Sequence, residues 1–190
     1  MLKEDLKIFI KIPTLYTERT VLRRITKSDL EDVYEYGTDP LVPKYLLWYN
    51  HPDKRYTLSY LSYLDKMYKQ AKFYDWGIEL DGKMIGTCGF TSIDTENNSA
   101  EIGYVLNSKF WGMGLATEVA KKVIEFGFDV LNLRRISARC MVENIESKRV
   151  MEKCGMRFEG ILKDAVFAKG EYKDVFLYSI TKPDYQEKCF

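Results

Sequence analysis

The clearest pattern in the chain is helical and follows a pair of glycines, Gly112 and Gly114. After Gly114, apolar side chains recur at intervals of three and four residues, which places them on one face of an α-helix. These positions are Ala116, Val119, Ala120, Val123, Ile124, Gly127, Phe128 and Leu131. We therefore predict a long amphipathic helix that lays one continuous apolar face on a sheet.

Three further helices are indicated by their start and stop signals. They begin at Ser28–Asp29, at Pro52–Asp53 and at Asn144, where polar caps or a first-turn proline precede apolar positions. The first ends at residues 38–40 and the last at Gly155. Their inward positions are expected to be Leu30, Val33 and Tyr34, then Leu58, Leu61, Leu64 and Met67, then Val150, Met151 and Cys154.

Alternating or β-branched segments between these helices predict strands. Asp81–Gly82 and Lys169–Gly170 are typical hairpin turns between two such pairs. The predicted strands are 17–25, 73–80, 83–93, 101–106, 134–142, 156–162 and 172–180. This order predicts an α/β arrangement, with a mixed sheet and helices on both of its faces.

Composition narrows the class of protein. The 190 residues fit one domain, and no repeat or linker divides them. With 29 Lys and Arg against 28 Asp and Glu, no net charge attracts the chain to nucleic acid or membrane. The four cysteines lack metal-ligand spacing, so we predict reduced thiols and no metal site. Because the amino-terminal stretch is acidic and lacks a cleavage site, we expect a cytoplasmic protein without a secretory leader.

The stretch from residue 100 to 117 combines a strand, a glycine turn and a helix start. Such a turn aims several backbone N–H groups at one point, and the helix dipole adds positive potential there, which suits a phosphate. A dinucleotide fingerprint is incomplete, because Thr117 stands where a third glycine is needed. A Walker-type loop is excluded, because no Gly-Lys-Ser/Thr occurs.

The sequence K-F-W-G-M-G-L-A-T at 109–117 resembles the acyl-CoA pyrophosphate loop (Q/R-x-x-G-x-G/A) of GNAT-type N-acetyltransferases. Further motifs resemble the RimJ/RimL-type branch: T-E-R-T-V-L-R-R, A-E-I-G-Y-V-L-N, V-E-N-I-E-S-K-R-V-M-E-K-C-G-M-R-F-E-G and G-E-Y-K-D-V-F-L-Y-S. Lys109, at the usual Gln/Arg position, and Lys121 and Lys122 in the helix depart from the pattern. The resemblance implies a single domain over 1–190 (core about 14–181), with a twisted, mostly antiparallel sheet of about seven strands.

The same resemblance implies that acetyl-CoA is the cofactor and assigns residues to it. The pantetheine arm would pair with the backbone of Tyr104, Val105 and Leu106, which requires only an accessible strand edge. The pyrophosphate loop would comprise Trp111, Gly112, Met113, Gly114, Leu115, Ala116 and Thr117. Asn144 would touch the arm, and Ser147 would lie near the sulfur and return a proton to the leaving thiolate; Asn144 also suits a plain N-cap.

The sequence indicates the general base less clearly than the cofactor-binding residues. Glu101 lies on the same strand face as Gly103 and is a candidate, although a solvated or ion-paired carboxylate is an equal reading. Asp174 and Glu159 are weaker candidates. Cys140 is expected to be a buried strand cysteine, and His51, the only histidine, is expected to serve recognition or packing.

The predicted reaction is direct attack of a neutral primary amine on the thioester, with a backbone amide stabilising the oxyanion. An α-amine with a pKa near 8 is about one-tenth neutral at pH 7, so an N-terminal α-amine of a protein or peptide needs only a modest base. Alternatives are a small polycationic amine (polyamine or aminoglycoside), for which Glu31, Asp32, Glu35 and Asp39 are available, or acyl-CoA binding without turnover. The acceptor is expected at 41–52, the second helix and 166–172, and the many tyrosines are compatible with a homodimer.

Overall fold

The computed structural model describes residues 4–188, which form one eight-stranded sheet with helices packed on it. The strand order is β1-β2-β3-β4-β5-β6-β8-β7, and every neighbouring pair is antiparallel except β5 and β6. The strands are β1 (Leu15–Tyr16), β2 (Val21–Arg23), β3 (Tyr74–Leu80), β4 (Lys83–Asp94), β5 (Ser99–Leu106), β6 (Arg135–Met141), β7 (Arg157–Ala168) and β8 (Glu171–Thr181). The predicted mixed α/β fold is confirmed.

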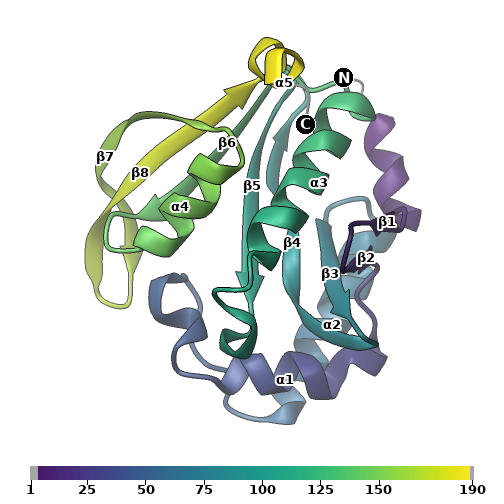
Figure 1. Cartoon of the computed structure of the whole chain (residues 1–190). Helices are drawn as coiled ribbons and strands as arrows, with labels where there is room; N and C mark the ends of the chain where they lie inside the picture. The colour runs from purple at the N-terminus through teal and green to yellow at the C-terminus, as the bar shows by residue number, and fades with distance from the viewer. Residues whose placement is uncertain (1–3, 189–190) are drawn as a thin grey trace.

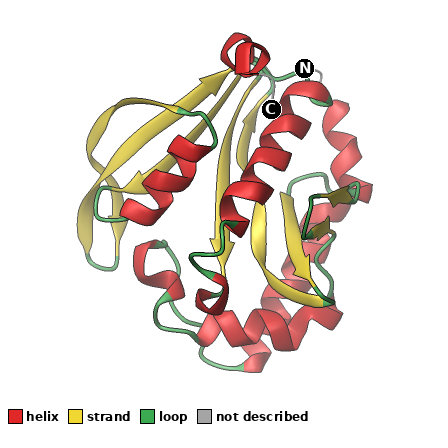
Figure 2. Cartoon of the chain, viewed as in Figure 1, coloured by secondary structure: helices red, strands yellow, loops and turns green. Residues whose placement is uncertain are grey.

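Helices cover both faces of the sheet (Figures 1 and 2). In these views α3 and α4 lie in front of the sheet, while α2 lies behind it. The α-helices are α1 (Leu30–Thr38), α2 (Lys54–Lys69), α3 (Leu115–Asp129), α4 (Ile145–Lys153) and α5 (Lys182–Lys188). Short 3-10 turns are η1 (Asp5–Lys11), η2 (Lys27–Asp29), η3 (Val42–Tyr45) and η4 (Ser108–Phe110). None of the helices in the described chain is long and apolar enough to cross a membrane.

The core forms where α3 lies on the sheet. Its predicted apolar positions Val119, Val123 and Phe128 are fully buried. They continue into an aromatic cluster in which Phe9 and Phe126 meet Trp76 edge to face, with ring centroids 5.7 and 5.2 Å apart. Burial of this face anchors the amino-terminal end of α3 against β5.

Some predicted elements differ from the structure. Within the strand expected at 17–25 only residues 21–23 form a strand, because hydrogen bonds between Thr17 and Thr20 close a turn at the start of that range and separate it from β1. Asp29 is the N-cap residue of α1, as predicted, but its side chain makes no cap hydrogen bond there and instead closes a capping box with Thr26 at the start of η2. Leu58 is 42% exposed and Tyr68 is fully buried, so α2 turns its apolar face further round than expected. Neither η1 nor α5 was expected, since neither carries a clear apolar repeat.

The parallel strands β5 and β6 pair along only part of their length. They run side by side at Ser99–Glu101 against Arg135–Ser137 and then diverge (Figure 1). Beyond Glu101, β5 stays paired with β4 as far as Leu106. The sheet therefore opens between β5 and β6, and that opening positions the candidate site.

Candidate active site

Beyond Glu101, the edge of β5 that faces the opening pairs with no strand among the described residues. Asn107 N–H donates to the Ile85 carbonyl on the β4 side at 2.8 Å, so alternation turns the N–H and C=O of Leu106 and Tyr104 toward the opening. Val105, the third residue expected to hold a pantetheine arm, turns its main chain to β4. The Leu106 carbonyl already accepts a bond from Trp111 Nε1 at 2.9 Å, which fixes the start of the glycine loop to this edge.

The glycine loop between η4 and α3 needs its glycines for backbone reasons. Gly112 and Gly114 have φ of 75° and 79°, in the left-handed region that side chains disfavour. Gly114 is the N-cap of α3, and no side chain caps that helix. The first N–H groups of α3, from Leu115 to Thr117, therefore lack intrahelical partners and point out of the helix end. This arrangement suits a pyrophosphate.

Arg19, in the β1–β2 turn, holds the loop in place. Its guanidinium donates to the Met113 carbonyl at 3.0 Å and pairs with Glu118 at 2.6 Å. Its own N–H also bonds Glu118. Although burial opposes it, hydrogen bonds from Thr17 and Arg19 lower the pKa of Glu118. Arg19 thereby offsets the negative charge of Glu118, which lies in the first turn of α3. Arg19 was not identified from the sequence, because its partners lie almost a hundred residues away.

We expect Arg19→Ala to weaken CoA binding about 3- to 10-fold, because loss of a charged hydrogen bond and an exposed ion pair costs on the order of 1 kcal/mol. Calorimetric titration with CoA measures it. Arg24→Ala is the matched control, because Arg24 also contacts one carbonyl (Ile10) and one carboxylate (Asp65), both away from the loop. Equal affinities for the two variants would contradict a role for Arg19 in the loop.

The amino-terminal end of α4 lies across the opening from β5. Asn144 caps this helix, with its Oδ1 accepting from Ser147 N–H at 3.1 Å. The Tyr104 hydroxyl reaches over from β5 and lies 2.9 Å from Ser147 Oγ and 3.0 Å from the Ser147 carbonyl. Burial raises the pKa of Tyr104, so this phenol stays protonated. The structure thus brings together three predicted residues from two elements, and it adds a side-chain role for Tyr104 that the sequence did not indicate.

The three carboxylates considered as the base are all paired. Glu101 forms an ion pair with Arg139 at 2.9 Å. Hydrogen bonds from Arg135 and Ser179 lower the pKa of Glu159 to about 2, and Lys163 lowers the pKa of Asp174. A carboxylate held as an anion by a cation is a poor proton acceptor.

Cys140 and His51 have structural surroundings. Burial raises the pKa of Cys140 to about 11, so the thiol is not an activated nucleophile. His51 is buried, with Nδ1 2.8 Å from Thr57 Oγ1, and its ring packs against Tyr56 and Tyr60. Burial lowers the pKa of His51 and keeps it neutral.

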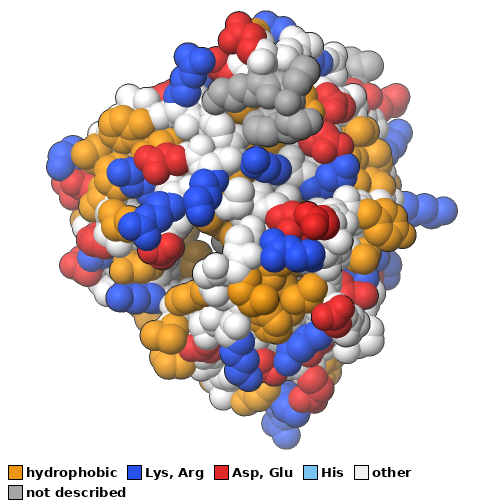
Figure 3. Space-filling model, viewed as in Figure 1, with side chains coloured by type: hydrophobic (Ala, Val, Ile, Leu, Met, Phe, Trp, Pro, Cys, Tyr) orange, Lys and Arg blue, Asp and Glu red, His pale blue; other side chains and the backbone are white. Residues whose placement is uncertain are grey.

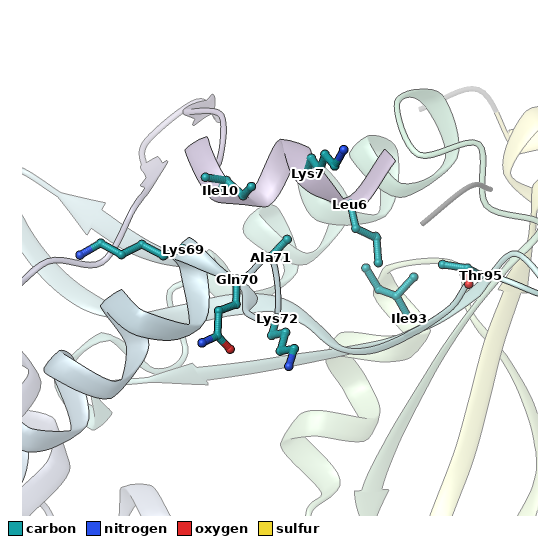
Figure 4. A pocket seen from close by; sticks show the side chains of 9 residues that line it. All are labelled: Leu6, Lys7, Ile10, Lys69, Gln70, Ala71, Lys72, Ile93 and Thr95. Carbon is teal, nitrogen blue, oxygen red and sulfur yellow. The ribbon is translucent and has the colours of Figure 1, made fainter. Parts of the chain in front are cut away.

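Two cavities flank the sheet at different ends. One of about 280 Å³ lies between η3, the carboxyl end of β6 and the β7–β8 hairpin. The other, of about 450 Å³, lies between η1, the end of α2 and the end of β4 (Figure 4). Because Ile93 in its wall pairs with Ala100, it sits at the closed end of β5, away from the glycine loop. The smaller cavity lies at the carboxyl end of β6, which has diverged from β5, and is the candidate acceptor region.

Residues 19–157 match the family model described as "Acetyltransferase (GNAT) domain". The chain belongs to the GNAT acetyltransferases. This GNAT chain is 37% identical over 174 residues to an uncharacterized N-acetyltransferase, p20, of Bacillus licheniformis, covering 90% of this chain and 98% of that protein. Its fold matches the crystal structure of a GNAT-family acetyltransferase from Bacillus anthracis with a TM-score of 0.79 and 31% identity, over 90% and 99% of the two chains.

The acetyl donor of this GNAT enzyme is acetyl-CoA. The microcin C7 self-immunity acetyltransferase MccE, solved with acetyl-CoA and AMP, matches with a TM-score of 0.78 and 25% identity, over 86% and 93% of the chains. The open edge of β5, the left-handed glycines and the uncapped start of α3 fit this donor. When bound, acetyl-CoA supplies an activated acetyl group. The face that carries α3 and α4 mixes basic, acidic and apolar side chains around these elements (Figure 3).

Proposed function

We propose that this acetyl-CoA-dependent N-acetyltransferase acts on the N-terminal α-amine of a protein or peptide. The observation that carries the proposal is the charge of the acceptor-side cavity. Its lining consists of Lys44, Tyr45, Met141, Glu143, Ala168, Lys169, Glu171 and Lys173. Lys173 lies 2.6 Å from Glu171 and 3.7 Å from Glu143, while Lys169 Nζ donates to the Pro43 carbonyl. Three lysines against two glutamates leave the rim positive, which repels a polycation and suits a peptide with acidic residues.

The carboxylates that a polyamine would need are already occupied. Glu31 pairs with Lys54 at 2.6 Å, and Asp32 accepts from Met84 N–H at 2.9 Å. Lys83, with Asn107 and Lys109, lowers the pKa of Glu35 to about 2. The fourth, Asp39, accepts bonds from the Ser108 hydroxyl and from Leu41 N–H. These contacts tie α1 to β4 and η4, so the cluster stabilises the fold.

The relatives whose names state an acceptor include one that acts on a polyamine and one that acts on a ribosomal protein. A spermidine N(1)-acetyltransferase of Escherichia coli is 28% identical over 86% of this chain, and a ribosomal-protein-serine acetyltransferase of the same organism is 34% identical over 52%. The basic rim favours the second kind of acceptor. The raised pKa of Cys140 supports direct attack by the amine over an acyl-enzyme intermediate.

The test is a thiol-release assay with acetyl-CoA and three acceptors: a peptide with acidic residues after its free N-terminus, a peptide of equal length with basic residues there, and spermidine. We expect the acidic peptide to react fastest. Because Lys44 is exposed and its ammonium group lies over the ring of Tyr45, Lys44→Glu should lower kcat/KM for the acidic peptide about 5-fold or more, as rim charges do.

Lys66→Glu, on the solvent side of α2, is the control and should leave that rate unchanged. Spermidine as the fastest acceptor, or equal rates for the two lysine variants, would refute the peptide assignment.

A further inference from the structure

The Tyr104 hydroxyl makes a contact that has no part in the proposed function. It reaches from β5 across the opening to the first turn of α4, where it lies 2.9 Å from Ser147 Oγ and 3.0 Å from the Ser147 carbonyl oxygen. The main-chain N–H and C=O of Tyr104 turn toward the same opening. An acyl-CoA arm that pairs with this edge of β5 therefore passes beside the Tyr104–Ser147 contact.

A phenol has one proton, and two oxygens of Ser147 lie within its reach. The Ser147 carbonyl oxygen can only accept, whereas Ser147 Oγ can donate or accept. In one arrangement Tyr104 donates to the carbonyl and accepts from the serine hydroxyl. In the other, Tyr104 donates to Ser147 Oγ, and the serine proton turns to a different acceptor. Rotation of the two hydroxyl groups interconverts these arrangements without any movement of the main chain.

The main chain of Ser147 is fixed, so its hydroxyl is the part that can turn. The Ser147 N–H donates to Asn144 Oδ1 at 3.1 Å, and the Ser147 carbonyl oxygen lies next to the Tyr104 hydroxyl. Tyr104 and Ser147 are both partly exposed, so the pair is not sealed inside the core.

Cys140 of β6 also lies beside Ser147. Burial raises the pKa of Cys140 to about 11, although a hydrogen bond from Ser147 opposes that rise. The Cys140 thiol therefore keeps its proton and donates to the Asn144 carbonyl at 3.7 Å. Because a neutral thiol accepts hydrogen bonds only weakly, Cys140 does not retain the serine proton against an anionic acceptor.

Neither hydroxyl of the pair is suited to give up its proton at neutral pH. Burial raises the pKa of Tyr104, and the alcohol of Ser147 is a weaker acid than a phenol. An ordinary thiol ionises near pH 8.5, at about the pKa of free cysteine, so its thiolate is too weak a base to deprotonate either group. The pair is suited to donate a hydrogen bond to a developing negative charge.

We propose that Tyr104 is a positioning residue for the departure of the CoA sulfur: its hydroxyl donates to Ser147 Oγ and thereby turns the serine proton toward that sulfur. The inference deepens the proposed function, and it rests on an acyl-CoA arm that lies along β5. Tyr104 acts only through Ser147, and removal of its hydroxyl leaves the serine proton without a fixed direction.

Tyr104 and Ser147 keep their protons throughout the step. The neutral amine nitrogen forms a bond to the thioester carbon, the C–S bond breaks, and the electron pair of that bond leaves on the sulfur. The Ser147 hydroxyl donates a hydrogen bond to this charge. The surplus nitrogen proton passes to water and the sulfur takes a proton from water, so the products are the amide and the thiol.

The first measurement is the pKa of the CoA thiol on the enzyme, followed by ultraviolet absorbance of the thiolate in a pH titration. CoA that lacks the sulfur atom is the blank, which cancels the signals of protein cysteines and tyrosines. We expect Tyr104→Phe to raise the bound-thiol pKa by at least about half a unit, and Ser147→Ala by at least as much. In the Ser147→Ala background, Tyr104→Phe should add less than about 0.2 unit.

The second measurement is kinetic and uses acetyl-CoA with the acidic peptide. Tyr104→Phe should lower kcat at least about 5-fold and change the KM for acetyl-CoA less than about 2-fold, because the main chain of β5 is unaltered. Ser147→Ala should lower kcat at least about 10-fold, through loss of a hydrogen bond to a charged group. Adding Tyr104→Phe to Ser147→Ala should change kcat less than about 2-fold.

Tyr178→Phe is the matched control. Tyr178 of β8 is a buried tyrosine whose hydroxyl also joins the sheet to α4, but it bonds Glu152 Oε1, at 3.1 Å. This variant should keep the kcat and the bound-thiol pKa of the wild type. Equal losses in Tyr178→Phe and Tyr104→Phe would mean that both tyrosines only dock α4, and would overturn the proposal.

Two further results also overturn the proposal: a bound-thiol pKa that Tyr104→Phe leaves unchanged, and a Tyr104→Phe effect that persists in full in the Ser147→Ala background. The thiol titration requires CoA but no acceptor. If the bound-thiol pKa shifts as expected while no amine is acetylated, the proposed α-amine function fails and the assignment of Tyr104 stands.

Discussion

Gly112→Val is expected to weaken CoA binding at least about 30-fold, because each hydrogen bond from a backbone amide to a charged group contributes roughly 1.5–3 kcal/mol. The φ of Gly112 is 75°, which a β-branched residue disfavours, so valine reshapes the loop that leads to the free N–H groups of α3. Calorimetric titration with CoA measures the effect.

The matched control is Gly82→Val in the β3–β4 hairpin. Gly82 has a φ of 78°, and a Cβ at either glycine meets no atom within 4 Å. The two variants therefore carry the same local strain, and only one lies in the loop. Gly82→Val should bind CoA like the wild type. Equal CoA affinities for the two variants would show that the loop does not hold the pyrophosphate.

Asp75→Asn in β3 is expected to stabilise the protein at pH 8, because the Asp75 Oδ1 is buried and has no hydrogen-bond partner among residues 4–188. The pKa of Asp75 rises from the usual 3.8 to about 7 on folding, so the folded state resists ionisation. At about 1.4 kcal/mol per pH unit, this group lowers the free energy of unfolding by up to about 4 kcal/mol above pH 7. The cost is absent below the unfolded pKa, grows between pH 4 and 7, and is complete above pH 7.

Urea unfolding of wild type and Asp75→Asn at pH 8 and pH 4 measures this linkage. The variant should be more stable at pH 8, and the difference should nearly vanish at pH 4. Asp94→Asn is the control of opposite sign, because hydrogen bonds from Asn97 lower the pKa of Asp94 and its removal should destabilise slightly at pH 8. A destabilised Asp75→Asn at pH 8 would contradict the buried, unpartnered state of this carboxylate.

Elements with a strong local repeat were predictable from the sequence. The helix after Gly114, the hairpins at Asp81–Gly82 and Lys169–Gly170, and the cap at Asn144 are all present. The strand expected at 17–25 is confirmed only at 21–23, because side-chain hydrogen bonds set the Thr17–Thr20 turn and hydrophobic alternation does not show them.

Some residues of the candidate site were also predictable from the sequence, and others were not. The loop glycines and Asn144 with Ser147 are visible as short motifs, and the structure sets them around one opening. Arg19 is not visible, because it acquires its role through the distant residues Met113 and Glu118. Register and ion pairing across the sheet carry no local signal.

The most direct test of the central claim is to incubate the enzyme with acetyl-CoA and one acidic peptide that has a free N-terminus and an internal lysine, and to locate the acetyl group by fragment-ion mass spectrometry. We predict one acetyl group on the α-amine and none on the lysine, with spermidine left unmodified when it is present at equal concentration. Acetylation of spermidine or of the lysine side chain, with the α-amine left free, would contradict the account.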